Sequence, residues 1–151
     1  MEKINFDTHT PLLLGISLND SDPTTFEGLP ISSKAELKAL YKTYFDGFYG
    51  LLKWESPLTA YGRGIKARAK LIDFMGKVIK VRLNKGRNIN PTQDFLSMML
   101  VGQQKKPDGI FSDILIKNQC LLQLWASHYQ VSGFVSSLIY QLGKYPLLLS
   151  I

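Results

Sequence analysis

Few side chains in this sequence have the types and spacing that acid–base or metal chemistry requires. The chain holds two histidines, His9 and His128, and one cysteine, Cys120. His128 could titrate near its ordinary pKa of about 6.5 and relay a proton, although a histidine in an apolar segment is more often simply hydrogen-bonded. Ser127 and Asp113 form no catalytic-triad pattern with it, and two histidines with one cysteine are too few for a metal site. We therefore expect no metal site.

The cysteine count and the first residues indicate the compartment. A single cysteine permits no internal disulfide, which is typical of a reducing compartment. Residues 1–5 carry no apolar stretch behind a basic tip, so they do not resemble a secretory signal. The sequence predicts a cytoplasmic protein.

Positive charge is concentrated in one part of the chain. The formal net charge is +6, and nine of the 18 basic residues fall between Arg63 and Arg87, with Asp73 as the only acid among them. Such a segment could attract the phosphates of nucleic acid. However, Phe74 is the only aromatic residue among the cations of 66–87, and cations on the outer face of an amphipathic helix are usually a solvated surface. Nucleic acid is therefore the less favoured partner.

The length and composition predict one folded domain, residues 1–151, because 45% of the residues are apolar and 20% charged. Ser33 and Glu36 have the spacing of a capping box, which predicts a helix start. Beyond it, apolar residues recur at steps of three and four, and this helical face must contact a core or a ligand. The residues on this face are Leu37, Leu40, Tyr41, Tyr44, Phe45 and Phe48.

Three shorter signals predict further helices. Residues 12–18 indicate a helix end before a loop, because turn formers and a proline follow. Asn90-Pro91 predicts the start of a short helix with Phe95, Met98 and Met99 on its apolar side. The basic segment 59–83 also has an apolar stripe at helical steps. That stripe consists of Ile65, Ala69, Ile72, Met75, Ile79 and Leu83.

The last element, about 113–143, is predicted to be a long buried central helix. Ser112 or Asp113 can cap it, and Lys117 is the only formally charged residue from 114 to 143. Thirty helical residues span about 45 Å. Polar residues interrupt this segment too often for an apolar run that could cross a membrane, so we expect no transmembrane span. The predicted fold class is all-α.

The order of these helices resembles the central part of a cytochrome P450. Residues 44–48 (Tyr-Phe-Asp-Gly-Phe), 66–71 and 94–100 resemble the F, G and H helices of this superfamily. Residues 121–146 resemble its long I helix, which passes over the haem. The resemblance covers the chain from about Leu12 onward and is closest to cyanobacterial-type members related to retinoid hydroxylases. It implies a helical fragment of that fold, from a family of haem-dependent monooxygenases that act on apolar substrates.

One departure from the family pattern affects oxygen activation. The family's I helix carries Ala-Gly-x-Glu-Thr or a close variant, whose acid and alcohol deliver protons to bound dioxygen. The aligned residues here are 126–130, Ala-Ser-His-Tyr-Gln: Ser127 stands at the glycine, Tyr129 at the acid and Gln130 at the alcohol, and His128 takes the variable position, with Ala126 matching the alanine. A phenol with a pKa of about 10 does not replace a carboxylate at neutral pH. We therefore expect impaired proton delivery.

A second departure concerns the haem. The family holds the iron through a cysteine in a glycine-rich loop, downstream of a Glu-x-x-Arg helix. These motifs have no matching positions here, and Cys120 precedes the I-helix motif and reads as a core residue. We expect no cofactor for this chain alone, although haem serves the parent family, and we expect it to be inactive as a monooxygenase by itself.

The resemblance also marks candidate substrate-binding residues: Phe45 and Phe48 on one helix, and Leu122, Trp125 and Ala126 on the long helix. An alternative hypothesis stays open. The chain could be a stand-alone helical module that binds an apolar small molecule or a helical protein partner, and that self-associates as a homo-oligomer. Half of a fold leaves apolar surface exposed, and water disfavours such surface.

Overall fold

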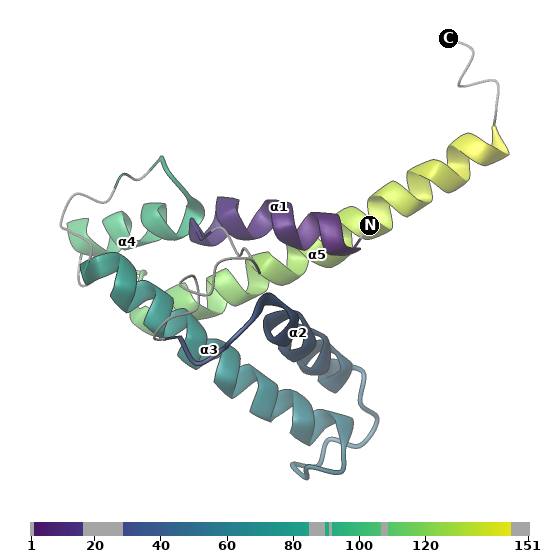
Figure 1. The fold of residues 1–151 in the computed structure, drawn as a ribbon, viewed down its shortest axis with the longest axis horizontal. Coiled ribbons are helices and arrows are strands. Elements are labelled where there is room, and N and C mark those ends of the chain that lie inside the picture. Colours follow the sequence, from purple (N-terminus) through teal and green to yellow (C-terminus); the bar gives the residue numbers. More distant parts are fainter. Residues whose placement is uncertain (1, 17–28, 85–89, 91, 107–108, 146–151) are drawn as a thin grey trace.

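The described part of the chain is entirely helical. The computed structural model describes residues 2–16, 29–84, 90, 92–106 and 109–145, with the side chains of 2–7, 128, 129 and 132 left out. Within these residues there are helices and connections but no strand, so the predicted all-α class is confirmed (Figure 1). The helices are α1 (Glu2–Leu14), α2 (Lys34–Phe48), α3 (Ala60–Asn84), α4 (Phe95–Lys105) and α5 (Asp113–Lys144).

The helices pack in two pairs that meet at α3 and α5. α2 lies along α3, α1 lies along α5, and α3 also contacts α5 (Figure 1). Two glycines allow α2 and α3 to approach closely, because a Cβ atom on Gly47 would lie 2.9 Å from the Cα atom of Gly64. α4 packs against α1 and α5 near the end of α3.

The core lies where these helices meet. On α2 the predicted face is largely confirmed, since Leu37, Tyr41 and Phe45 are buried, while Phe48 is exposed. On α3 the predicted stripe was partly wrong. Ile65, Ala69 and Leu83 face outward, and only Met75 and Ile79 of the expected set are fully buried. α3 has apolar residues on more than one side, and the side that packs against α2 and α5 is not the predicted stripe as a whole. The buried residues on that side include Ala67, Leu71, Phe74 and Val78.

The helix caps follow local rules, with one exception. Ser33 caps α2 as predicted, since its Oγ accepts a hydrogen bond from the Glu36 amide at 3.2 Å. The Glu36 carboxylate returns this bond to Ser32 instead of Ser33, accepting from its amide at 2.9 Å. Ser112 caps α5 through the Leu115 amide. The exception is α4, whose cap is Asp94 and not Asn90-Pro91; Pro91 itself lies outside the described residues.

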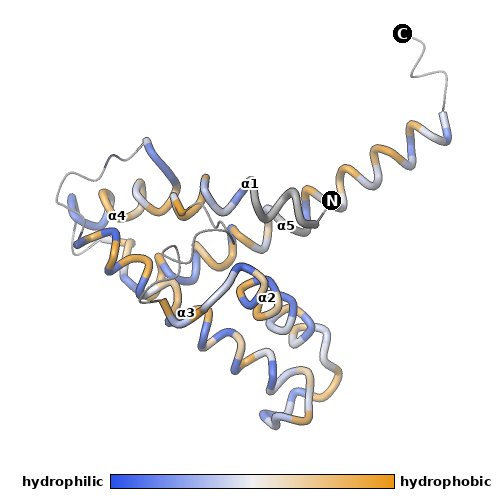
Figure 2. Tube along the Cα trace, in the orientation of Figure 1, coloured by the Kyte–Doolittle hydropathy of each residue, from blue (hydrophilic) through white to orange (hydrophobic). Residues whose placement is uncertain are grey.

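The long helix α5 is confirmed in length but is buried only in its first half. Ile116, Cys120 and Leu124 belong to the core, whereas Phe134 and Leu138 are exposed. Figure 1 shows the last turns of α5 running past α1, and Figure 2 shows that hydrophobic residues continue along this projecting part. The predicted burial fails here because no other helix of the described chain covers it. Within the same residues, no helix combines the length and apolar character needed to cross a bilayer.

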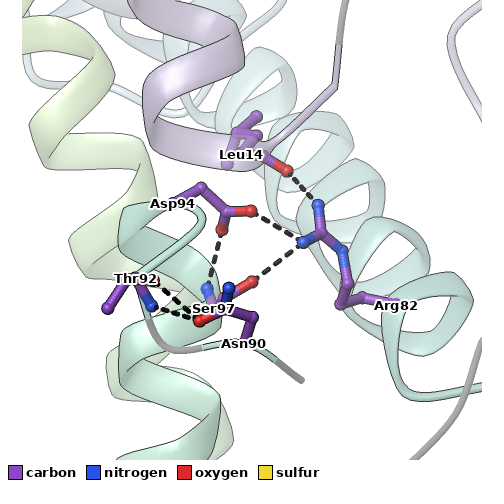
Figure 3. A network of polar contacts seen from close by, with 6 residues as sticks. All are labelled: Leu14, Arg82, Asn90, Thr92, Asp94 and Ser97. Carbon is purple, nitrogen blue, oxygen red and sulfur yellow. Dashed lines mark hydrogen bonds and ion pairs between the residues drawn. The ribbon is translucent and has the colours of Figure 1, made fainter. Parts of the chain in front are cut away.

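A buried ion pair joins the ends of three helices (Figure 3). Arg82, near the end of α3, donates from Nη1 to Asp94 Oδ2 at 2.7 Å and to Ser97 Oγ at 2.8 Å. Its Nη2 donates to the carbonyl oxygen of Leu14, the last residue of α1, at 2.8 Å. Asp94 also accepts from the Ser97 amide at 2.7 Å and so caps α4. The exposed fraction of the side chain is 15% for Arg82 and 0% for Asp94.

This junction predicts the stability of an Asp94→Ala variant. The substitution leaves the Arg82 guanidinium buried without its anion and removes the cap of α4, so we expect the free energy of unfolding to fall by about 3–5 kcal/mol. Urea unfolding followed by circular dichroism measures it. The matched control is Asp46→Ala, which breaks an exposed ion pair with Lys42 on α2 and should change stability by less than about 0.5 kcal/mol. Equal losses in the two variants would show that the junction is not a main source of stability.

Candidate functional site

A cavity of about 510 Å³ lies between α2 and α5. Its size falls within the range of small-molecule sites, which is roughly 300–1,000 Å³. α2 supplies one wall together with the residue that follows it, and the first half of α5 supplies the other. The lining residues are Tyr44, Phe45, Phe48, Tyr49, Asn118, Leu121, Leu122 and Trp125.

Aromatic rings form most of the cavity wall. Phe45 and Phe48 are three residues apart on α2 and therefore share one face of it, with ring centroids 5.8 Å apart. The rings of Phe45 and Trp125 stack across the two helices, with centroids 5.5 Å apart and an angle of 19° between their planes. Tyr44 packs its ring against Phe48 at 5.1 Å. Such a wall favours flat apolar groups, because aromatic rings gain from offset stacking beyond the burial of area.

Polar groups in the cavity are few. Asn118 Oδ1 accepts a hydrogen bond of 2.8 Å from Nη2 of Arg68 on α3, which turns the amide NH₂ group toward other acceptors. The hydroxyls of Tyr44 and Tyr49 and the indole N–H of Trp125 are the other side-chain polar groups in the lining. The cavity can therefore orient a ligand through one or two hydrogen bonds but offers no acid–base pair.

A second cavity, of about 360 Å³, lies on the other side of Tyr44 and Phe48, which line both cavities. It is bounded by α3 and by the connection between α2 and α3. Its polar lining residues include Lys53, Tyr61 and Arg68, and the Lys53 ammonium lies 5.3 Å from the centre of the Tyr61 ring. The two cavities thus differ in character, because the first is aromatic and the second has cations in its lining.

The cysteine does not suit a metal or haem. Cys120 is buried on α5 and lines neither of these two cavities. Burial, and to a smaller extent the charge of Asp94, raises the pKa of its thiol to about 12. A thiolate is the form that binds metal, and at neutral pH this group stays protonated. Among the described residues, no three His, Cys, Asp or Glu side chains are grouped as a metal site. The residues that the structure describes therefore do not fit a haem iron.

Four of the five candidate substrate-binding residues line the first cavity: Phe45, Phe48, Leu122 and Trp125. Ala126 is half-buried and is not among the lining residues. That the four bind a ligand remains a prediction. Sequence reasoning did not select the other lining residues, although Tyr44 and Leu121 lie inside the segments that carry the family resemblance. Asn118 has no sequence signal, because an amide inside a helix is a common surface residue.

The altered oxygen-activation segment is only partly described. Ser127 Oγ donates to the carbonyl oxygen of Leu124 at 3.0 Å, so its hydroxyl is used within the helix, and Gln130 is exposed. The side chains of His128 and Tyr129 lie outside the described residues. Impaired proton delivery therefore stays a prediction.

Comparison with known proteins finds one distant relative that covers most of this chain. It is the protein named "Putative cytochrome P450 120" from Synechocystis sp., which is 29% identical over 126 residues. The alignment covers 83% of this chain and 27% of the Synechocystis protein, so the chain matches about a quarter of that protein's length. No protein-family model and no solved structure matches the chain. The chain is thus similar to one part of a cytochrome P450.

The state of Cys120 gives a chemical prediction. At about pH 8.5 a cysteine in the unfolded chain is half deprotonated, whereas a thiol with a pKa of about 12 is almost entirely protonated and is also shielded. We expect iodoacetamide to alkylate the native chain at least ~100-fold more slowly than the urea-unfolded chain, measured by mass spectrometry over time.

The raised pKa and the burial of the Cys120 thiol also predict the outcome of adding haem. After addition of haem, reduction and carbon monoxide, the spectrum should lack the band of thiolate-ligated iron, and Cys120→Ser should give the same spectrum as the parent chain. A thiolate band that disappears in Cys120→Ser would contradict the assignment of Cys120 to the core.

Proposed function

We propose that this chain is a helical, cytochrome P450-like fragment that binds an apolar ligand between α2 and α5 and does not act as a monooxygenase by itself. The observation that carries the proposal is the cavity whose walls meet through the stacked rings of Phe45 and Trp125. The similarity to the Synechocystis protein supports the same reading, because substrates of the haem-dependent monooxygenase family are apolar.

The proposed lack of activity rests on the residues present. Monooxygenation of the P450 type needs a thiolate on iron, and the chain's one cysteine, Cys120, is buried and held protonated. It also needs a proton route, for which Tyr129 and Gln130 are poor substitutes for an acid and an alcohol. The proposed chain therefore binds its ligand and does not oxidise it. We also propose that the protein works in the cytoplasm, as its single cysteine suggests.

The ligand that fits best is flat or elongated and has little charge. The cavity is lined by five aromatic residues and two leucines, and burying apolar area is worth about 25 cal/mol per Å². One hydrogen-bonding group on the ligand could use the Asn118 amide. Because the chain resembles retinoid-hydroxylase-type members, a retinoid is the first natural ligand to test.

A matched pair of leucine variants tests the cavity. Leu122 lines it and Leu138 lies farther along the same helix, and their exposed fractions are similar, 48% and 46%. Leu122→Trp should fill the cavity and weaken binding of the neutral probe N-phenyl-1-naphthylamine at least ~10-fold, which corresponds to about 1.4 kcal/mol. Leu138→Trp should change binding less than ~2-fold. Probe fluorescence gives both values, and equal affinities in the two variants would rule out the cavity as the binding site.

A second function is favoured by the projecting half of α5, which we propose to be a self-association face. Apolar residues there recur at steps of three and four and continue the side of the helix that carries buried Cys120 and Leu124. No residue from Asn118 to Gly143 is formally charged, so two copies can pair along this face without repulsion. We call these residues the distal stripe. It consists of Val131, Phe134, Val135, Leu138, Ile139 and Leu142.

A lysine on the distal stripe should weaken the dimer, because pairing would bury an unpaired charge. We expect Leu138→Lys to raise the dimer dissociation constant at least ~10-fold, measured by analytical ultracentrifugation. Tyr140→Lys is the matched control, since Tyr140 is 67% exposed, lies neither three nor four residues from any member of the distal stripe, and should leave the dimer intact. A parent chain that is monomeric at every concentration would refute the self-association face.

A further inference from the structure

The second cavity, beside Tyr44 and Phe48, has the composition of a site for a small anion. Its volume of about 360 Å³ falls within the range of small-molecule sites. Lys53 and Arg68 both line it, and none of the lining residues that the structure describes is a carboxylate. The described lining of the first cavity, by contrast, holds no cation. The neutral ligand proposed for the first cavity therefore leaves the second without an occupant.

The two cations are held in place but not neutralised. Lys53 Nζ donates to the carbonyl oxygen of Phe48 at 2.8 Å, and Arg68 Nη2 donates to Asn118 Oδ1 at 2.8 Å. Both acceptors are uncharged, and within the part of the chain that the structure describes neither cation forms an ion pair. An ammonium group has three N–H donors and a guanidinium five, so each cation keeps donors for an anion.

Aromatic rings lie next to these cations. The apolar lining of the second cavity consists of Gly47, Gly64, Ile65 and the rings of Tyr44, Phe48 and Tyr61. The Lys53 ammonium lies 5.3 Å from the centre of the Tyr61 ring, so positive charge and aromatic surface are adjacent. Flat rings gain from stacking on such a wall. The cavity thus combines a surface for a ring with donors for a negative charge.

The exposure of the cations argues against a bare inorganic ion as the ligand. Lys53 and Arg68 are both exposed, and an exposed ion pair adds little affinity because water and salt screen it. A free phosphate or sulfate would gain only this contribution. A ligand that also buries a ring gains from the loss of apolar surface to water. A neutral aromatic ligand, in turn, would make no use of the two cations.

We infer that the second cavity binds a small aromatic monoanion, with its ring against Tyr44, Phe48 and Tyr61 and its charged group beside Lys53 and Arg68. The site is separate from the cavity between α2 and α5, although Tyr44 and Phe48 line both. It does not depend on the function proposed for that cavity, and the two ligands can be bound at the same time.

Two fluorescent probes that differ by one charged group test the site on the full chain. 8-Anilino-1-naphthalenesulfonate is N-phenyl-1-naphthylamine with an added sulfonate. We expect the sulfonate probe to bind the parent chain and Leu122→Trp, in which the first cavity is filled, with affinities within ~2-fold of each other. Raising the salt concentration from about 0.05 M to about 0.5 M should weaken its binding at least ~3-fold, and should change binding of the neutral probe less than ~2-fold.

A matched pair of tryptophan variants locates the site. Ile65 lines the second cavity and Leu83 does not, and both lie on α3 with similar exposed fractions, 36% and 42%. Ile65→Trp should lower the affinity for the sulfonate probe at least ~10-fold, because the larger side chain fills the cavity. Leu83→Trp should change it less than ~2-fold. Circular dichroism checks that both variants keep the helix content of the parent chain.

A matched pair of lysine variants tests the role of charge. Lys53 and Lys66 are both exposed, but only Lys53 lines the cavity, so Lys53→Gln and Lys66→Gln remove the same charge from different places. Lys53→Gln should lower the affinity for the sulfonate probe at least ~3-fold. It should leave the affinity for the neutral probe unchanged. Lys66→Gln should change the affinity for either probe less than ~1.5-fold.

Three results would overturn the inference. Binding of the sulfonate probe that is lost in Leu122→Trp and kept in Ile65→Trp would place the anion in the first cavity. Equal losses in Lys53→Gln and Lys66→Gln would mean that the probe follows the overall positive charge of the chain. A neutral probe that loses as much affinity as the sulfonate in Ile65→Trp would mean that the cavity does not select an anion. The neutral probe tests the first cavity separately, so either proposal can fail without the other.

Discussion

The arrangement of helices depends on one buried guanidinium. Arg82 on α3 holds the carbonyl end of α1 through Leu14 and the start of α4 through Asp94 and Ser97. A buried charge is tolerated only when it is paired and hydrogen-bonded, so the three helix ends cannot separate without a large cost. The fit also constrains Gly15, whose φ is 60° and where an added Cβ atom would collide with both charged groups. Glycine is the residue that meets both conditions.

This junction also places the walls of the cavity, although it lies outside it. It anchors α1, which packs along α5, and it fixes the end of α3, along which α2 lies. The close approach of Gly47 and Gly64 sets the distance between α2 and α3, and the bond from Arg68 to Asn118 ties α3 to α5. α2 and α5 are thus positioned through α3. The cavity remains between them where the aromatic rings hold them apart.

Helix positions and caps could be predicted from the sequence where they depend on neighbouring residues, and less well where they depend on contacts between helices. Ser33 was identified as a cap, and Ser112 as one of two candidates, because a capping bond forms within one helical turn. The start of α4 was misplaced although its cap is equally local, a bond from the Ser97 amide to Asp94, because the Asn90-Pro91 pair was taken as the start signal. The buried side of α3 was predicted only in part, because this helix has apolar residues on two sides and its packing against α2 and α5 determines which side is buried.

The site was predicted to the extent that it consists of helix faces. Phe45, Phe48, Leu122 and Trp125 lie on predicted helices within the segments that resemble a cytochrome P450, and all four line the cavity. Asn118 could not be selected, because its role depends on a partner on another helix. The burial of α5 was overestimated. A segment with almost no charge indicates a buried helix, but it does not reveal how much of the helix other elements of the same chain contact.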